Sequence, residues 1–376
     1  MLQMNAKTRL ATMWLATLTI ALACVAALYG AHTAQQAPPI KLGTSGSNVK
    51  DINSSFCCTG TLGSQVKDAN GAKYILSNNH VLARSNAGAA GEGIMQRGYV
   101  DTVPPCTRTG TIIVAHLTKF VKLNFSGGNN TVDAALAKVV SGQVNTNGAI
   151  LQIGTVSSAT ATPAVGMAVE KSGRTSGLTS GKISSVNVSV NVTGYGACGT
   201  GTQTAKFVKQ FAINSSTFSS GGDSGSLILK KPATGQKPNP VGLLFAGGTG
   251  VTFANGINNV LSAFGVTFDA TAPNPAELAA AADVPDPEIA AASSVKDKYD
   301  DFLFSLPEVV GHGVGEGRVR PRGDPALLAA SHRRGPSGRA ACAGEHSGRD
   351  PGDRRDSRNS QLHQLPVLQE VGRPWR

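Results

Sequence analysis

The chain has few aromatic residues and no long amphipathic helix before about residue 285. Aromatic side chains make up 5% and charged side chains 15% of the 376 residues, whereas glycine occupies 45 positions. The missing helical periodicity argues against a helical bundle in the central region. That region instead holds short alternating runs of Val, Thr, Ser and Asn, for example residues 183–192. Alternation with frequent turn residues is typical of β-strands, so we predict an all-β protein.

Charge is missing from a long segment near the N-terminus. Lys7 and Arg9 precede an uncharged stretch from Leu10 to Gly30. A basic start followed by an apolar segment predicts a signal peptide within residues 1–34. The apolar segment is long for a signal peptide and is also long enough to span a bilayer. We therefore expect a secreted or periplasmic protein, with membrane anchoring by residues 10–30 as the alternative.

The cysteines lack the Cys-x-x-Cys spacing of a zinc site, and no pair of histidines accompanies them. Cys57, Cys58, Cys106 and Cys198 lie in the globular part. An even number of cysteines in an exported chain predicts disulfides. A bond between the neighbours Cys57 and Cys58 would close a strained ring. Each of the two is therefore expected to pair with either Cys106 or Cys198, and both connectivities stay open. We expect no metal and no cofactor.

Lysine is absent after Gly315. Residues 316–376 hold twelve arginines and seven acidic residues, with no apolar periodicity. Two interpretations stay open: a disordered basic tail, or translation of a GC-rich gene in a shifted frame. The net charge of this segment is only +5, of a formal +11 for the whole chain, which is weak for binding a polyanion. We predict no nucleic-acid partner.

Two segments are expected to precede this tail. Residues 269–287 are rich in Ala and Pro and predict a linker. Residues 288–315 predict a truncated module, with a helix from Val295 to Phe304 and a strand that starts near Leu306.

The segment around Ser224 is the most informative of the chain. Residues 220–226 read Ser-Gly-Gly-Asp-Ser-Gly-Ser, and three apolar residues follow. Small neighbours let a substrate approach Ser224 closely. Gly222 tolerates positive φ, so its N–H can turn toward the same point as the N–H of Ser224. Two convergent N–H groups beside a hydroxyl would form an oxyanion hole and a nucleophile. The alternative is a Gly/Ser turn before a strand.

His80 is the candidate base for this serine. The apolar strand around residues 74–76 runs into Ser-Asn-Asn and then His80, which predicts an imidazole delivered to a surface at a strand end. The alternative is an exposed turn histidine. His116 is the other histidine of the central region, and its alternating strand places it toward solvent or the edge of the core.

Asp133 is the candidate acid. It is a lone charge in an apolar run that continues to Val140. A buried carboxylate is costly unless it is hydrogen-bonded, and an imidazole N–H is a suitable partner. The alternative is an aspartate at a strand edge that faces water. Asp68 and Asp101 are rivals, but each lies in a loop.

The order His80, Asp133, Ser224 along the chain resembles that of the trypsin-like (chymotrypsin-fold) serine peptidases, in their bacterial secreted branch. Three further segments support the resemblance. Lys171 to Ile183 looks like the strand–turn–strand that opens the second barrel. Val241 to Gly248 looks like the strand that lines the primary specificity pocket, and Ile257 to Phe264 like the terminal helix.

The resemblance implies two six-stranded Greek-key β-barrels with a short C-terminal helix, within residues 35–268. The first barrel would cover about residues 43–150 and the second about residues 165–268. The active site would lie between them.

It also implies roles for the candidate residues. Ser224 would be the nucleophile, His80 the base and Asp133 the residue that orients it, with Gly222 and Ser224 as the oxyanion hole. Asp223 is expected to have a structural role. The specificity pocket would involve Phe218, Phe245, Ala246 and Gly247. Phe218 stands six residues before the nucleophile, where an acid would favour cleavage after Lys or Arg. We therefore expect the substrate to have a small or apolar residue before the scissile bond.

The predicted function is therefore that of an exported, monomeric serine endopeptidase acting on peptides or proteins. The alternative is a catalytically silent protein of the same fold that binds peptides or a cell-surface partner. All three triad residue types are present, which favours the enzyme.

Overall fold

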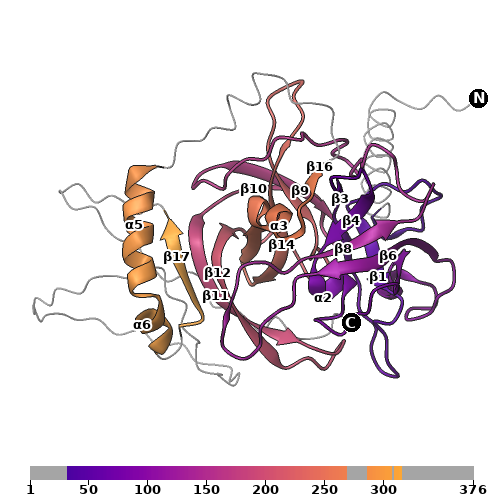
Figure 1. The fold of residues 1–376 in the computed structure, drawn as a ribbon, viewed down its shortest axis with the longest axis horizontal. Helices are drawn as coiled ribbons and strands as arrows, with labels where there is room; N and C mark the ends of the chain where they lie inside the picture. The colour runs from indigo at the N-terminus through magenta and orange to yellow at the C-terminus, as the bar shows by residue number, and fades with distance from the viewer. Residues whose placement is uncertain (1–31, 269–285, 307–308, 316–376) are drawn as a thin grey trace, which may run out of the picture.

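The computed structural model describes residues 32–268, 286–306 and 309–315 (Figure 1). Two curled sheets lie side by side, one built from the indigo and magenta part of the chain and the other from the later part. The predicted signal segment, linker and Arg-rich tail lie almost entirely outside the described residues. Among the described helices, none is long and apolar enough to cross a membrane.

The first sheet has eight strands in the order β16-β3-β4-β8-β6-β5-β1-β2, and every pair in it is antiparallel. All but one of its strands come from the first barrel predicted from the sequence. The exception is β16, which comes at the end of the range predicted for the second barrel and pairs with β3 of the first sheet. The strands are β1 Thr44–Asn48, β2 Gly60–Leu62, β3 Ser64–Lys67, β4 Lys73–Ser77, β5 Gly93–Gln96, β6 Ile112–Phe120, β8 Ala135–Val139 and β16 Thr267–Phe268.

The second sheet has nine strands, of which eight follow the order β10-β9-β13-β14-β15-β12-β11-β17, while β7 pairs in parallel with β12. The strands are β7 Asn129–Asn130, β9 Ala168–Gly173, β10 Gly177–Lys182, β11 Ser185–Tyr195, β12 Gln203–Asn214, β13 Leu227–Lys230, β14 Asn239–Gly248, β15 Val251–Gly256 and β17 Gly311–Gly315. The all-β, two-barrel fold predicted from the sequence is thus confirmed. The described strands exceed six per barrel because short strands such as β16 and β17 join the sheet edges.

Alternation along the strands builds the core. In β6, Val114, Ala115 and Leu117 are buried, whereas His116 between them is exposed, as expected. Apolar side chains of both sheets and of the terminal helix pack in one large cluster, and two smaller clusters fill the second barrel. Burying these side chains is the main favourable term of folding.

The described helices are short. They are α2 Asn79–Leu82, the 3-10 helix η1 Tyr99–Asp101, α3 Ile257–Phe264, α5 Pro287–Lys298 and α6 Asp300–Ser305. The terminal helix α3 has the expected bounds, and it ends at Gly265, whose φ of 67° is the left-handed conformation that glycine adopts without strain.

The C-terminal module packs on the second sheet. Two helices occupy the region where one helix over residues 295–304 was predicted, because Asp286 caps α5 early and the chain turns at Tyr299. β17 then pairs antiparallel with β11. Figure 1 shows α5 and β17 at the side of the second sheet that faces away from the first. The described part of the module therefore extends the sheet.

Two disulfides settle the open connectivity as Cys57–Cys106 and Cys58–Cys198. The first closes a loop within the first barrel. The second joins the segment before β2 to the tip of the β11–β12 hairpin, and so links the two barrels.

Candidate active site

His80 lies just beyond the end of β4, in the first turn of α2. The two asparagines before it anchor this turn. Asn78 donates from Nδ2 to the carbonyl oxygen of Asp133 at 2.7 Å, and Asn79 donates to the carbonyl oxygen of Val121, also at 2.7 Å. The asparagines therefore fix the backbone that carries the imidazole, while the His80 side chain stays 25% exposed.

Asp133 is fully buried and lies against His80. Its Oδ2 is 2.6 Å from Nδ1 of His80, and its Oδ1 accepts from the backbone N–H of His80 at 3.3 Å. The backbone N–H of Asp133 donates to Oδ1 of the buried Asn255 at 3.0 Å. A carboxylate in this position holds the imidazole with Nδ1 protonated, which leaves Nε2 free to accept a proton.

Tyr195 supplies a further hydrogen bond to the same carboxylate, which the sequence did not reveal. Its hydroxyl donates to Oδ2 of Asp133 at 2.8 Å. Burial, followed by the charge of Asp133, raises the pKa of the phenol well above its usual value, so the hydroxyl stays a donor. Its ring lies edge-on to the His80 imidazole, with 5.9 Å between centroids. No motif marks Tyr195, because the end of β11 reaches Asp133 only through the packing of the two barrels.

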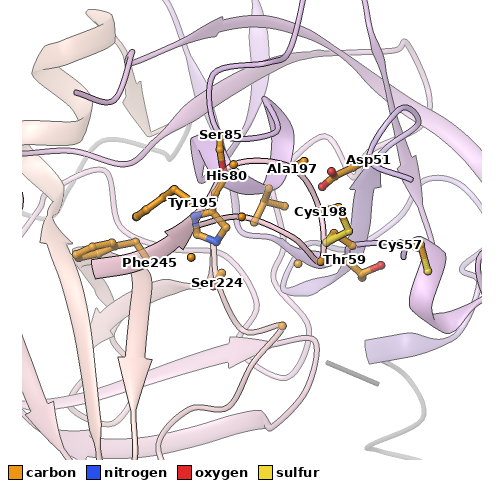
Figure 2. Close-up of a pocket in the computed structure, with 18 of the residues that line it drawn as sticks. Asp51, Cys57, Thr59, His80, Ser85, Tyr195, Ala197, Cys198, Ser224 and Phe245 are labelled. Carbon is orange, nitrogen blue, oxygen red and sulfur yellow. A yellow bond between two sulfur atoms is a disulfide. The ribbon is translucent and has the colours of Figure 1, made fainter. Parts of the chain in front are cut away.

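Ser224 lines the same pocket as His80, and Figure 2 shows the two side chains next to each other. Gly222 has a φ of +93°, and a Cβ there would come within 2.5 Å of Thr175 Oγ1. Within the described residues, the backbone N–H groups of Gly222 and Ser224 have no hydrogen-bond partner. The segment around Ser224 therefore offers two free backbone donors, which is the number that an oxyanion hole requires.

Asp223 holds the loop that carries these donors. It is fully buried and accepts hydrogen bonds from the backbone N–H groups of Thr175, Ser176 and Ser220. Its Oδ2 also lies 3.2 Å from Nζ of the buried Lys171. Burial lowers the pKa of Lys171, and the neighbouring Asp223 opposes that shift. The sequence indicated local bonding by Asp223 but did not indicate the lysine, which comes from β9.

The β11–β12 hairpin forms one wall of the pocket between the barrels. Residues 192–199 of the hairpin line it together with His80, Ser224 and Phe245, around a cavity of about 180 Å³. The hairpin tip is fastened to the first barrel by Cys58–Cys198 and by a hydrogen bond from Asn53 Nδ2 to the carbonyl oxygen of Cys198 at 3.0 Å. Both barrels therefore shape the site.

Of the four residues predicted for the specificity pocket, one lines the pocket in the structure and two lie in the apolar core. Phe245 lines the pocket, whereas Ala246 is buried beside it in the apolar core and Gly247 follows on β14. Phe218 is not among the described residues that line the pocket. It lies in the core of the second barrel with Phe211. Its ring turns inward, whereas the family resemblance implied a place at the bottom of the specificity pocket.

The rival aspartates have other partners. Asp68 accepts from two backbone N–H groups of its own turn and from the hydroxyl of Tyr74. Asp101 binds the guanidinium of Arg174 through two hydrogen bonds of 2.6 and 2.7 Å, and this ion pair links the barrels beside the pocket. Neither residue contacts His80.

One group of side chains in the pocket wall has the spacing of metal ligands. The group consists of Asp51, Cys58 and Cys198. Cys58 and Cys198 are bonded to each other, and a disulfide offers no thiolate for a metal. Asp51 alone does not make a metal site.

Comparison with protein families matched one part of the chain. The profile of the Nal1 C-terminal domain, Nal1_C, matches residues 121–257, just over a third of the chain. This segment contains Asp133 and Ser224 but not His80. The comparison with curated protein sequences gave no match.

Similar solved structures are proteases. A glutamic acid specific serine protease is 20% identical, with a TM-score of 0.39, over 61% of this chain and 100% of its own. The Nocardiopsis protease NAPase is 18% identical, with a TM-score of 0.40, over 62% and 99%. Cellulomonas bogoriensis chymotrypsin is 20% identical, with a TM-score of 0.38, also over 62% and 99%. Likeness at this level assigns no activity, so the function has to be inferred from the residues of the site.

Proposed function

We propose that the protein is a serine endopeptidase that works through an acyl-enzyme. The observation that carries the proposal is the arrangement around Ser224. A buried carboxylate orients an imidazole, the imidazole lines the same pocket as the serine, and Gly222 and Ser224 of that pocket each have a free backbone N–H group. These are the parts that acyl transfer needs.

The reaction proceeds in two halves. Ser224 Oγ bonds to the scissile carbonyl carbon while its proton passes to Nε2 of His80, and the N–H groups of Gly222 and Ser224 bind the oxyanion. The C–N bond then breaks, and the leaving amine takes the proton from His80. Water attacks the acyl-enzyme in the same way, releasing the carboxylic acid product and restoring Ser224. Asp133 stabilises the imidazolium in both halves, and no metal or cofactor takes part.

Substrate and location follow from the same features. Two apolar side chains line the pocket, Phe245 from β14 and Val192 from the β11–β12 hairpin. We therefore propose that the substrate has a small or apolar residue before the scissile bond. Disulfides persist in oxidising compartments, which supports secretion or a periplasmic location. The proposed substrate is a peptide or protein, and the proposed enzyme is monomeric.

A fluorophosphonate probe tests the nucleophile directly. We expect the native protein and the Ser220→Ala variant to be labelled, because Ser220 is an exposed serine of the same segment. The Ser224→Ala variant should not be labelled, and its hydrolysis of peptides should fall by about a million-fold in kcat. If the native protein remained unlabelled at Ser224 while still binding peptides, the catalytically silent alternative would replace this proposal.

A further inference from the structure

Asp51 is an acid without a partner in the wall of the candidate active site. Its side chain is 8% exposed, and of the described residues that line the pocket it is the only acidic one. Its carboxylate makes no hydrogen bond or ion pair within the described residues. The nearby cations Lys50 and Arg84 bind Glu92 instead, at 3.3 and 2.7 Å.

A carboxylate in this situation is poised to receive a cation. Burial raises the pKa of Asp51 to about 7, Arg84 and His80 oppose the shift, and Glu92 adds to it. The ionised form is thus disfavoured by burial, which Arg84 and His80 offset only in part. A buried charge is costly unless it is paired, so a ligand that brings a cation would stabilise the ionised form.

Within the described part of the chain, the Asp51 side chain forms no bond that holds the fold. The segment that carries it is fixed through its backbone, where Cys58 N–H donates to the carbonyl oxygen of Asp51. The sulfur atoms next to the carboxylate belong to the Cys58–Cys198 disulfide and bind no metal. What remains on the open side of the carboxylate is the pocket.

The position of Asp51 relates it to one half of the substrate. In Figure 2, His80 and Ser224 lie between Phe245 on one side and Asp51 on the other. If the residue before the scissile bond lies against β14, which carries Phe245, the residues after the bond extend toward Asp51. The acid then faces the leaving-group half.

We propose that Asp51 is a specificity residue that binds the side-chain cation of a lysine or arginine in the first or second position after the scissile bond. This inference rests on the proposed function, because it takes its direction from the attack of Ser224. The enzyme would then prefer an apolar residue before the scissile bond and a lysine or arginine after it.

Quenched peptides test this inference. Each peptide has an apolar residue before the scissile bond. Lys, Arg, Met or Glu is placed at either the first or the second position after it. For the native protein we expect the Lys and Arg peptides to exceed the Met peptide roughly ten- to a hundredfold in kcat/KM at one position, as for other hydrogen bonds to charged groups. In Asp51→Asn this ratio should fall to within about twofold, whereas Asp68→Asn should keep it. Equal ratios in the native protein and Asp51→Asn, or no cation preference in the native protein, would overturn the inference.

A binding measurement separates this inference from the proposed function. With Ser224→Ala, fluorescence anisotropy compares the affinity for the labelled Lys and Met peptides at pH 6 and pH 8. The preference for Lys should increase with pH, because Asp51 ionises through about 7. The increase should be lost in the Ser224→Ala, Asp51→Asn double variant, which separates Asp51 from His80 in the same pocket. This pair of results would support Asp51 even if the fluorophosphonate probe failed to label the native protein. A preference that does not change with pH would count against Asp51.

Discussion

At the scale of single residues, Asp133 is the most tightly constrained group of the site. The Asp133 carboxylate accepts from the His80 ring, from the His80 backbone and from Tyr195, all away from water. These donors replace the water that the carboxylate loses on burial, which offsets the cost of burying it. The orientation of His80 therefore depends on each of these partners.

Replacing Asp133 by asparagine should lower kcat by roughly ten thousand-fold while the fold is kept, because the amide can stabilise the wrong tautomer of His80. Steady-state kinetics and a thermal melt check both parts. Asp68→Asn is the matched control and should retain native turnover. Asp101→Asn is unsuitable as a control, because the ion pair of Asp101 with Arg174 supports the pocket. Native-like turnover in Asp133→Asn would show that another residue orients the imidazole.

Replacing Tyr195 by phenylalanine should lower kcat about ten- to a hundredfold, the size expected for a hydrogen bond to a charged group. The change in KM should be smaller. Without the phenol, the Asp133 carboxylate loses one of its donors and holds the His80 ring less firmly, so the loss should appear in kcat. Tyr99→Phe removes a comparable buried hydroxyl, which donates to the carbonyl oxygen of Val49, and should leave kcat unchanged. A native kcat in Tyr195→Phe would reduce Tyr195 to a packing role.

At the scale of elements, the β11–β12 hairpin connects the two barrels at the site. It carries Tyr195 toward Asp133, and its tip packs so closely on the first barrel that a Cβ at Gly199 would lie 2.1 Å from Phe56. The Cys58–Cys198 disulfide fixes the tip across a sequence separation of 140 residues. The hairpin therefore forms a wall of the pocket and also holds Asp133 in place through Tyr195.

Removing the Cys58–Cys198 disulfide by paired serine substitutions should cost about 2–5 kcal/mol of stability and also lower kcat/KM. The loss of activity is expected because the released tip no longer holds Tyr195 and the pocket wall. The control removes Cys57–Cys106 in the same way, and it should lose stability with little loss of turnover. Thermal melts and kinetics at a temperature where both variants are folded make the comparison. Equal turnover in the two variants would mean that the hairpin keeps its place without the bond.

At the scale of the whole molecule, the helices and strand after residue 285 are attached to the second barrel. Lys296 is almost fully buried, donates to Ser189 of β11 and lies 2.9 Å from Asp300, which also binds Lys206 of β12. These side chains lower the pKa of Asp300 to about 2. His312 of β17 is buried beside them, and burial, aided by Lys296, lowers its pKa to about 4.

A chain that ends at residue 268 should fold and hydrolyse peptides, because His80, Asp133, Ser224 and their hydrogen-bond partners all precede that point. A chain that ends at residue 315 should melt higher, by on the order of 5 °C, because β17 covers the edge of β11. This advantage should diminish as the pH falls from about 6.5 toward 4, since the unfolded chain then takes up a proton on His312 that the folded chain disfavours. Melting curves of the two chains at pH 7 and pH 4.5 measure the difference. Loss of turnover on removing residues 269–315 would show that the module supports the site.

The sequence determined the features that local chemistry dictates. Alternation made the strands recognisable, the small residues around Ser224 marked a loop with free N–H groups, and the lone charge of Asp133 in an apolar run marked a carboxylate that needs a partner. Only the tertiary structure decided which groups meet across the barrels. Tyr195 reaches Asp133, Lys171 reaches Asp223, and Cys198 selects Cys58 because strands distant in the chain pack together. Phe218 turned into the core, and Asp51 was left facing the pocket, for the same reason: the direction of a side chain depends on the packing of the whole fold, which the sequence around it does not encode.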